Sequence, residues 1–191
     1  SEVQIAEPIV PPCEDWSTME KLAKEKEVVG IYISGHPLDD YKFEMKYFCN
    51  AKLESLKNLE QHLGKNLSFG GIVTNVQHRT AKNGKGWATF VLEGYDESYE
   101  FRIFDEEYLK YRHFLLQNQF VYFKINVKEG WVNRETGKKS DPRIQFLDAK
   151  MLADVLPTFA KKLFIHLDIK DLHSNFVTEL NELFAANAGD N

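Results

Sequence analysis

The middle of the chain alternates between apolar and polar residues with a period of two, the spacing of strands that bury one face. The alternation begins at Leu67 in "NLSFGGIVTNVQ" and returns in "WATFVLE", "YEFRIF", "FVYFKINVK" and "RIQFLDAKM". These runs predict five strands. On them we expect inward side chains at Ala88, Phe90, Leu92, Tyr99, Phe101, Ile103, Val121, Phe123, Ile125 and Val127. Outward side chains are expected at Trp87, Thr89, Val91, Glu100, Arg102, Tyr122, Lys124, Asn126 and Lys128.

Two further features of this region favour one architecture. Gly70-Gly71 interrupts the first run, and glycine within a strand favours a bulge or a sharp bend. A helical pattern over about residues 106–117 separates the third run from the fourth. Five coiled strands with a helix between the third and the fourth are typical of the OB-fold. The expected class is therefore mainly β with flanking helices (α+β), built on a five-stranded OB-fold barrel.

Helical spacing precedes the strands. Ser17 and Glu20 form a capping-box pattern, which predicts a helix over residues 18–29. "ISGHPLDD" ends this helix, because glycine and proline resist helix continuation. Further helices are predicted over about 39–48 and about 53–63. On the first helix the side chains expected to face inward are Met19, Leu22, Ala23 and Val29.

The end of the chain repeats neither pattern for long. Residues 163–167 alternate, and a helix with Ser174 as its cap follows. One strand and one helix cannot enclose a core, so this segment is expected to be part of a larger domain. The predicted organisation is a linker (1–16), a helical segment (17–64), an OB-fold domain (65–151) and the incomplete start of a C-terminal domain (152–191).

Composition narrows the class of protein. The 191 residues are 43% hydrophobic and 13% aromatic, which supports a packed core rather than disorder. No apolar run approaches the roughly 20 residues that cross a membrane, and the first residues lack signal-peptide features. Cys13 and Cys49 lack CxxC spacing, so we expect no metal site, no disulfide framework and a cytoplasmic location.

Charge is unevenly distributed along the chain. The formal net charge is −5, yet residues 65–150 carry 14 basic and 11 acidic residues, a net charge of +3. The segments on both sides are acidic. A mildly basic middle region indicates a polyanionic partner, although nucleic-acid-binding domains are often far more basic.

The basic residues gather in two predicted loops. An OB-fold commonly binds single strands across strands 2 and 3, between the loops that join strands 1–2 and 4–5. Loop cations would meet phosphates, and an outward aromatic ring would stack on a base. The candidate nucleic-acid-binding residues are Arg79, Lys82, Lys85, Trp87, Arg102, Arg134, Lys138, Lys139 and Arg143.

Simpler interpretations of the same residues remain open. "KNGKG" is also a good hairpin turn, because Asn-Gly favours positive φ. Trp87 could pack under the loop, and Arg102 could pair with Glu100 or Glu93. No histidine or cysteine spacing, serine-nucleophile motif, Walker motif or paired-aspartate pattern indicates catalysis or a cofactor, so we expect this chain not to be an enzyme.

One stretch carries a family likeness. "EKEVVGIYISGHPLDDY" resembles a segment that precedes the OB module of bacterial replicative DNA polymerase III alpha subunits, and "GGIVTNVQ…TAKNGKGWATFVLEG" with "YEFRIFDEEYLKYR" resembles the OB strands and helix that follow. The likeness covers roughly Met19 to Leu183. It implies a C-terminal fragment of a DNA-directed DNA polymerase, a nucleotidyltransferase, without the catalytic aspartates.

The resemblance also implies partners. The OB module of this family lies near the template and is implicated in binding single-stranded DNA, while other parts of the parent chain bind other replisome subunits. Two alternatives stay open: an OB-fold module that binds RNA in the manner of tRNA-anticodon domains, and a protein-interaction scaffold within the replisome without affinity for nucleic acid.

Overall fold

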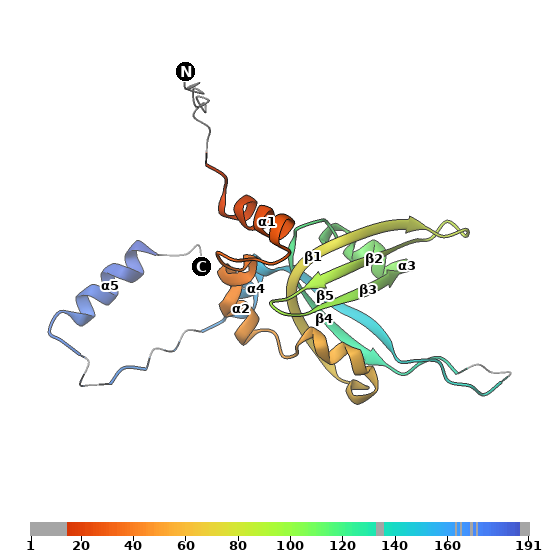
Figure 1. Cartoon of the computed structure of the whole chain (residues 1–191). Helices are drawn as coiled ribbons and strands as arrows, with labels where there is room; N and C mark the ends of the chain where they lie inside the picture. The colour runs from red at the N-terminus through yellow and green to blue at the C-terminus, as the bar shows by residue number, and fades with distance from the viewer. Residues whose placement is uncertain are drawn as a thin grey trace, which may run out of the picture. The chain divides into compact units, whose positions relative to one another are not determined.

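The computed structural model describes residues 15–132, 136–162, 164, 166–168, 170 and 172–187. The chain divides into two compact units, Ser1–Phe159 and Ala160–Asn191. The first unit contains the sheet and most of the helices (Figure 1). In the described residues, no helix has both the length and the apolar character needed to cross a membrane.

The sheet has five antiparallel strands in the order β3-β2-β1-β4-β5. The helix α3 (Asp105–Tyr111) and the short 3₁₀ helix η3 (Arg112–Phe114) lie between the third and fourth strands in sequence. This arrangement confirms the predicted OB-like α+β class. The strands are β1 (Asn66–Thr80), β2 (Gly86–Glu93), β3 (Ser98–Phe104), β4 (Phe120–Lys128) and β5 (Arg143–Met151).

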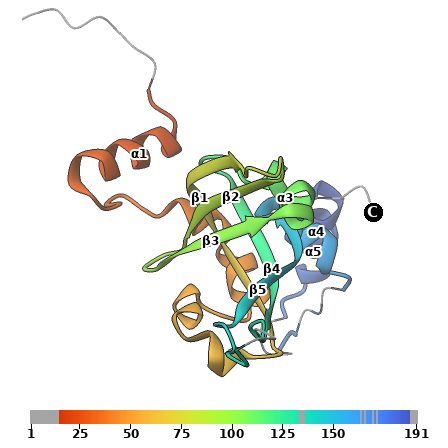
Figure 2. The same cartoon turned by 90° about the vertical axis from the view of Figure 1, so that its right-hand side faces the viewer.

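The barrel that the sequence predicts is not closed. β3 and β5 are the two edges of the sheet, and no ladder joins them among the described strands. The sheet curls so that these edges approach each other (Figure 2), and the rings of Phe101 and Phe146 meet between them with centroids 5.7 Å apart. Inward side chains, rather than backbone hydrogen bonds, therefore connect the two edges.

Helix α3 supplies the reason that β5 tolerates an open edge. The Glu107 carboxylate interacts with the backbone N–H of Phe146, which acts to lower the pKa of that carboxyl. The Tyr111 hydroxyl donates to the carbonyl of Leu147 at 2.7 Å. Buried backbone polar groups need partners, and α3 provides them where a closing strand would otherwise lie.

The core is built from the predicted inward positions. The Phe90 ring lies 5.3 Å from Phe101 and 5.5 Å from Phe123, and Phe123 lies 5.4 Å from Phe146, all measured between ring centroids. These rings fill the space inside the curled sheet. Nine of the ten predicted inward residues are buried, and Tyr99, which is partly buried, packs against the same cluster.

Asn126 was expected to face solvent but is buried. Tyr122, for which the same was expected, is buried as well. It packs with Leu38, Ile72, Leu152 and Val155 in a second cluster on the other face of β1 and β4. Segments from distant parts of the sequence cover this face, so β4 is buried on both sides there. The segments that cover this face are η1 (Pro37–Tyr41), α2 (Lys42–Tyr47) and α4 (Leu152–Phe159). The sequence pattern did not predict α4.

The glycine pair of β1 serves close packing rather than a bulge. A Cβ at Gly70 would overlap the Met45 sulfur, and a Cβ at Gly71 would lie 2.7 Å from the carbonyl oxygen of Glu93. The register shift of β1 lies further along, between Thr74 and Gln77. The bulge is therefore not at the glycines, where it was expected. At those two positions the missing side chains allow α2 to pack closely on one side and β2 on the other.

The first helix, α1 (Thr18–Val29), has the predicted capping box between Ser17 and Glu20. Of the expected inward residues only Leu22 is buried, whereas Met19 and Val29 are exposed. The helices predicted over 39–48 and 53–63 form as η1 with α2 and as the 3₁₀ helix η2 (Leu53–His62).

"SGHPL" shapes the turn between α1 and η1. His36 Nδ1 accepts a hydrogen bond from the backbone N–H of Leu38 at 3.1 Å. The imidazole ring packs against Tyr95, with ring centroids 4.6 Å apart. The Tyr95 hydroxyl donates to the carbonyl of Leu38 at 2.9 Å. His36 therefore fixes this turn against the β2–β3 connection.

The second unit contains α5 (Phe176–Ala186). Its N-cap is Asn175, not Ser174 as predicted, and the Asn175 side chain makes no capping hydrogen bond. Residues 163 and 165 of the expected strand lie outside the described residues, and Phe164, His166 and Leu167 are not in a strand.

Candidate nucleic-acid interface

Three predicted cations lie on the hairpin between β1 and β2. The turn is held by the Ala81 N–H, which donates to the Lys85 carbonyl at 2.8 Å, and Gly84 adopts a φ of 81°. Lys82 is exposed in the turn and has no ion pair among the described residues. Lys85 lies 3.3 Å from the Asp105 carboxylate. The turn is thus a true hairpin that also presents a free ammonium group.

A row of three side chains crosses β1, β2 and β3 on the outer face of the sheet. Arg79 pairs in register with Trp87, and Trp87 pairs with Phe104. The Arg79 guanidinium carbon lies 5.4 Å from the centroid of the Trp87 ring, and the Trp87 and Phe104 rings stack with centroids 5.7 Å apart and an interplanar angle of 21°. Trp87 is half-buried within this row, whereas Phe104 is 51% exposed.

Phe104 was not among the predicted site residues. The alternation of "YEFRIF" places it on the same side as Glu100 and Arg102, so the signal was present in the sequence. Because its ring continues the stack from Trp87 into solvent, Phe104 offers a flat apolar surface of the kind on which bases stack.

Arg102 lies in a second row, next to the first. It pairs in register with Thr89, which pairs with Gln77. Its guanidinium lies 3.5 Å from the Glu100 carboxylate, and both side chains are exposed. Exposed ion pairs of this kind contribute about 0–1 kcal/mol, so Arg102 can exchange this partner for a phosphate at little cost.

The β4–β5 connection holds the remaining predicted cations. Arg134 lies outside the described residues. Lys138 is exposed, and Lys139 lies 3.0 Å from the Glu129 carboxylate. The Arg143 guanidinium carbon lies 4.5 Å from the centroid of the Trp131 ring.

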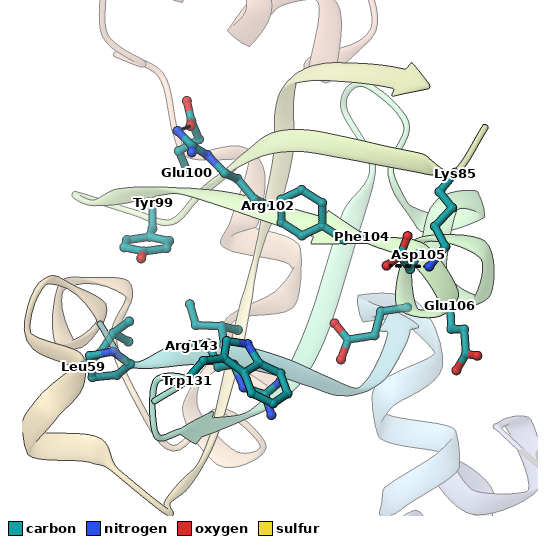
Figure 3. Close-up of a pocket in the computed structure, with 13 residues that line it drawn as sticks. Leu59, Lys85, Tyr99, Glu100, Arg102, Phe104, Asp105, Glu106, Trp131 and Arg143 are labelled. Carbon is teal, nitrogen blue, oxygen red and sulfur yellow. Dashed lines mark ion pairs between the residues drawn. The ribbon is translucent and has the colours of Figure 1, made fainter. Parts of the chain in front are cut away.

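A groove of about 840 Å³ runs between the open edges. Figure 3 shows Arg102 and Phe104 on β3, with Trp131 and Arg143 on the opposite side. Of the predicted residues, the groove brings together Lys85, Arg102 and Arg143. The other described candidates, Arg79, Lys82, Trp87, Lys138 and Lys139, do not line it.

The groove also carries acidic side chains at the start of α3. Asp105, Glu106 and Glu107 all line it. Burial raises the pKa of Glu107, although its interaction with the Phe146 N–H acts in the opposite direction. An anionic ligand therefore meets both attraction and repulsion along this groove.

Two further observations on the described residues concern metal binding and nucleophilic chemistry. No group of three or more histidine, cysteine, aspartate or glutamate side chains within them is placed to hold a metal ion. Burial raises the pKa of Cys49 to about 12, so its thiol is not a ready nucleophile. The exposed aromatic rings and guanidinium groups of this surface are suited to stacking and to pairing with phosphate.

These features define an open-edged, OB-like module with aromatic and cationic side chains on its outer face and in its groove. No model of a known protein family matches the chain. It is similar to DNA polymerase III alpha subunits: 29% identical to that of Saccharopolyspora erythraea over 123 residues (63% of this chain, 10% of the relative), 34% identical to that of Borreliella burgdorferi over 108 residues (56% and 9%), and 40% identical to that of Neisseria meningitidis serogroup B over 70 residues (37% and 6%).

The chain spans about a tenth or less of the length of these relatives. The resemblance found in the sequence is confirmed over the matched part of the chain. It identifies the chain as similar to a segment of a replicative polymerase subunit.

Proposed function

We propose that this chain is a non-catalytic module of a bacterial replicative DNA polymerase and that it binds the single-stranded DNA template. The parent would be a cytoplasmic DNA-directed DNA polymerase acting in DNA replication, with other replisome subunits bound to the rest of its chain. The similarity to DNA polymerase III alpha subunits supports the parent. The observation that carries the binding function is the row formed by Arg79, Trp87 and Phe104.

The row combines the two interactions that single strands offer. A base can stack on the exposed ring of Phe104, which Trp87 supports from behind. Stacking of this kind is worth about 1–3 kcal/mol per base and tolerates any base. The cations of the β1–β2 hairpin lie beside the row, where they can meet the phosphates on either side of a stacked base.

We expect weak binding with a marked dependence on salt. Lys85 and Arg102 already have carboxylate partners, so a phosphate must compete for them. Each phosphate contact to a single strand contributes about −0.7 to the slope of log affinity against log salt concentration. Replacing Lys82 and Lys85 by alanine should therefore flatten this slope by about 1.4.

The test is a fluorescence anisotropy titration of oligo-dT at several salt concentrations. Phe104→Ala should weaken binding about 5- to 150-fold, the equivalent of one stacked base, and leave the salt slope almost unchanged. The Lys82→Ala/Lys85→Ala variant should change the slope. A Lys24→Ala/Lys57→Ala variant is the matched control, since it removes two exposed lysines that do not line the groove and are paired with Glu27 and Glu54.

Two outcomes would contradict the proposal. If neither variant differs from the control, the basic hairpin is only a turn, and a role as an interaction scaffold is favoured. If RNA of the same sequence binds more tightly than DNA, the module recognises the 2′-hydroxyl and belongs with the RNA-binding OB modules.

A further inference from the structure

Trp131 stands at the base of the long β4–β5 loop and is held there by its backbone. Its N–H donates to Ser140 Oγ at 2.8 Å, and its carbonyl accepts from the Ser140 N–H at 2.8 Å. An isolated bridge between Val132 and Lys139 continues this pairing. A Cβ at Gly130 would collide with the carbonyl of Ser140, so the two sides of the loop approach each other as only glycine permits.

The indole ring is nonetheless one of the most exposed large apolar groups of the chain. Trp131 is 70% exposed. Arg143 lies over its ring at 4.5 Å, a contact that limits the freedom of the side chain. The backbone of Trp131 is therefore fixed, a cation lies over its ring, and most of its surface is exposed to solvent. This arrangement suits the ring to stacking with a flat ligand.

Trp131 and Phe104 line the same groove from opposite sides (Figure 3): Phe104 ends β3, and Trp131 lies in the connection between β4 and β5. β3 and β5 are the two unpaired edges of the sheet, so no backbone ladder crosses between them. Each ring has a guanidinium group nearby in the groove, Arg102 on the side of Phe104 and Arg143 on the side of Trp131. Both sides of the groove thus carry an aromatic ring and an arginine: Arg143 lies over the Trp131 ring, whereas Arg102 pairs with Glu100.

We propose that Trp131 is a second stacking site and that a single strand binds by bridging the open groove from Phe104 to Trp131. This proposal rests on the proposed function, since both sites serve the same ligand. A short strand reaches only the Phe104 site. A strand long enough to span the groove engages both rings and the cations beside them, so affinity rises in a step at a threshold length.

The experiment measures affinity against length, using oligo-dT of about 4 to 16 nucleotides, the range of site sizes known for single OB folds. The wild-type chain should show a rise of roughly 5- to 150-fold at the threshold, the effect expected of one additional stacked base. Trp131→Ala should abolish the step and leave the affinity for the shortest strands unchanged. Phe104→Ala should weaken binding at every length.

Two variants serve as controls. Trp16→Ala removes another exposed tryptophan, outside the groove, and should leave the step intact. Arg143→Lys keeps the charge but loses the planar group over Trp131, and should reduce the step without removing it. Thermal melts of all variants establish that they are folded.

The outcomes separate this proposal from the function on which it rests. If Phe104→Ala weakens binding but Trp131→Ala behaves as wild type at every length, the bridging proposal is wrong and the proposed function stands. The bridging proposal is also wrong if Trp131→Ala weakens all lengths equally, because Trp131 then belongs to the first site. Absence of binding by the wild-type chain at every length overturns both.

Discussion

The Tyr111 hydroxyl donates a hydrogen bond to the carbonyl of Leu147 across 36 residues of sequence, at 2.7 Å. Leu147 lies at the irregularity of the β4–β5 ladder, where the register shifts between Lys124 and Ile125. This contact ties α3 to the open edge of β5, on one side of the groove.

Loss of this hydroxyl should weaken the edge. We expect Tyr111→Phe to lower the free energy of unfolding by about 1 kcal/mol, since it removes one hydrogen bond but keeps the buried ring. Urea denaturation measures the change. Tyr47→Phe, at an exposed position, is the control and should be neutral. Equal stability of the two variants would show that water replaces Tyr111 at the Leu147 carbonyl.

The turn at "SGHPL" should make stability depend on pH. Burial lowers the pKa of His36 below its ordinary value of 6.5, outweighing the nearby carboxylates of Asp39, Glu93 and Asp96. The folded state therefore prefers the neutral ring, whose Nδ1 can accept the hydrogen bond from Leu38 N–H. Its contribution is complete above the unfolded-state pKa and is lost as pH falls through the lowered folded-state pKa.

The matched variant is His36→Asn, because an asparagine side chain can also accept this hydrogen bond but does not titrate. Between about pH 7.5 and pH 5, the wild-type chain should lose more stability than the variant. Parallel denaturation curves at both values would show that His36 does not contribute to the pH dependence.

The two glycines of β1 should differ in their tolerance of a side chain. Gly70→Ala would press against the Met45 sulfur, the end of a flexible side chain, whereas Gly71→Ala would press against the Glu93 carbonyl. Overpacking typically costs about 1–3 kcal/mol. We expect Gly71→Ala to be the more destabilising of the two, as measured by urea denaturation. The reverse order would mean that β2 moves more readily than α2.

The acidic residues at the start of α3 should limit the affinity for DNA. Glu106 is exposed, lines the groove and has no ion pair among the described residues. Glu106→Gln should raise the affinity for oligo-dT roughly twofold at low salt, and the gain should vanish at high salt as screening removes the repulsion. Asp154→Asn, on α4 outside the groove, should change nothing. A gain that persists at high salt would indicate a direct contact instead.

The strands could be predicted because the alternation of apolar and polar residues shows which face of each strand is buried. It placed Phe90, Phe101 and Phe123 in the core, and it also placed Phe104 on the outer face, where its use was overlooked. The burial of Tyr122 could not be predicted in the same way. It depends on packing against α2, which precedes the strands in the sequence, and α4, which follows them. The sequence pattern did not predict α4.

The open edge was equally hidden from the sequence. The number and order of strands suggest closure, whereas Glu107 and Tyr111 contact backbone groups of β5 that lie more than thirty residues away in sequence. For the same reason the groove that joins Phe104 to Trp131 could not be foreseen, although both aromatic residues are visible in the sequence.

An open sheet normally exposes rows of backbone groups that other chains can extend, which invites aggregation. Here Glu107 and Tyr111 occupy part of the row on β5, and Glu100 and Arg102 place opposite charges along β3. A second copy approaching either edge would have to displace a helix or desolvate an ion pair. The groove between the two edges can therefore stay accessible to a flexible ligand, while pairing of either edge with another β-strand is disfavoured. This selectivity does not require a lid over the groove.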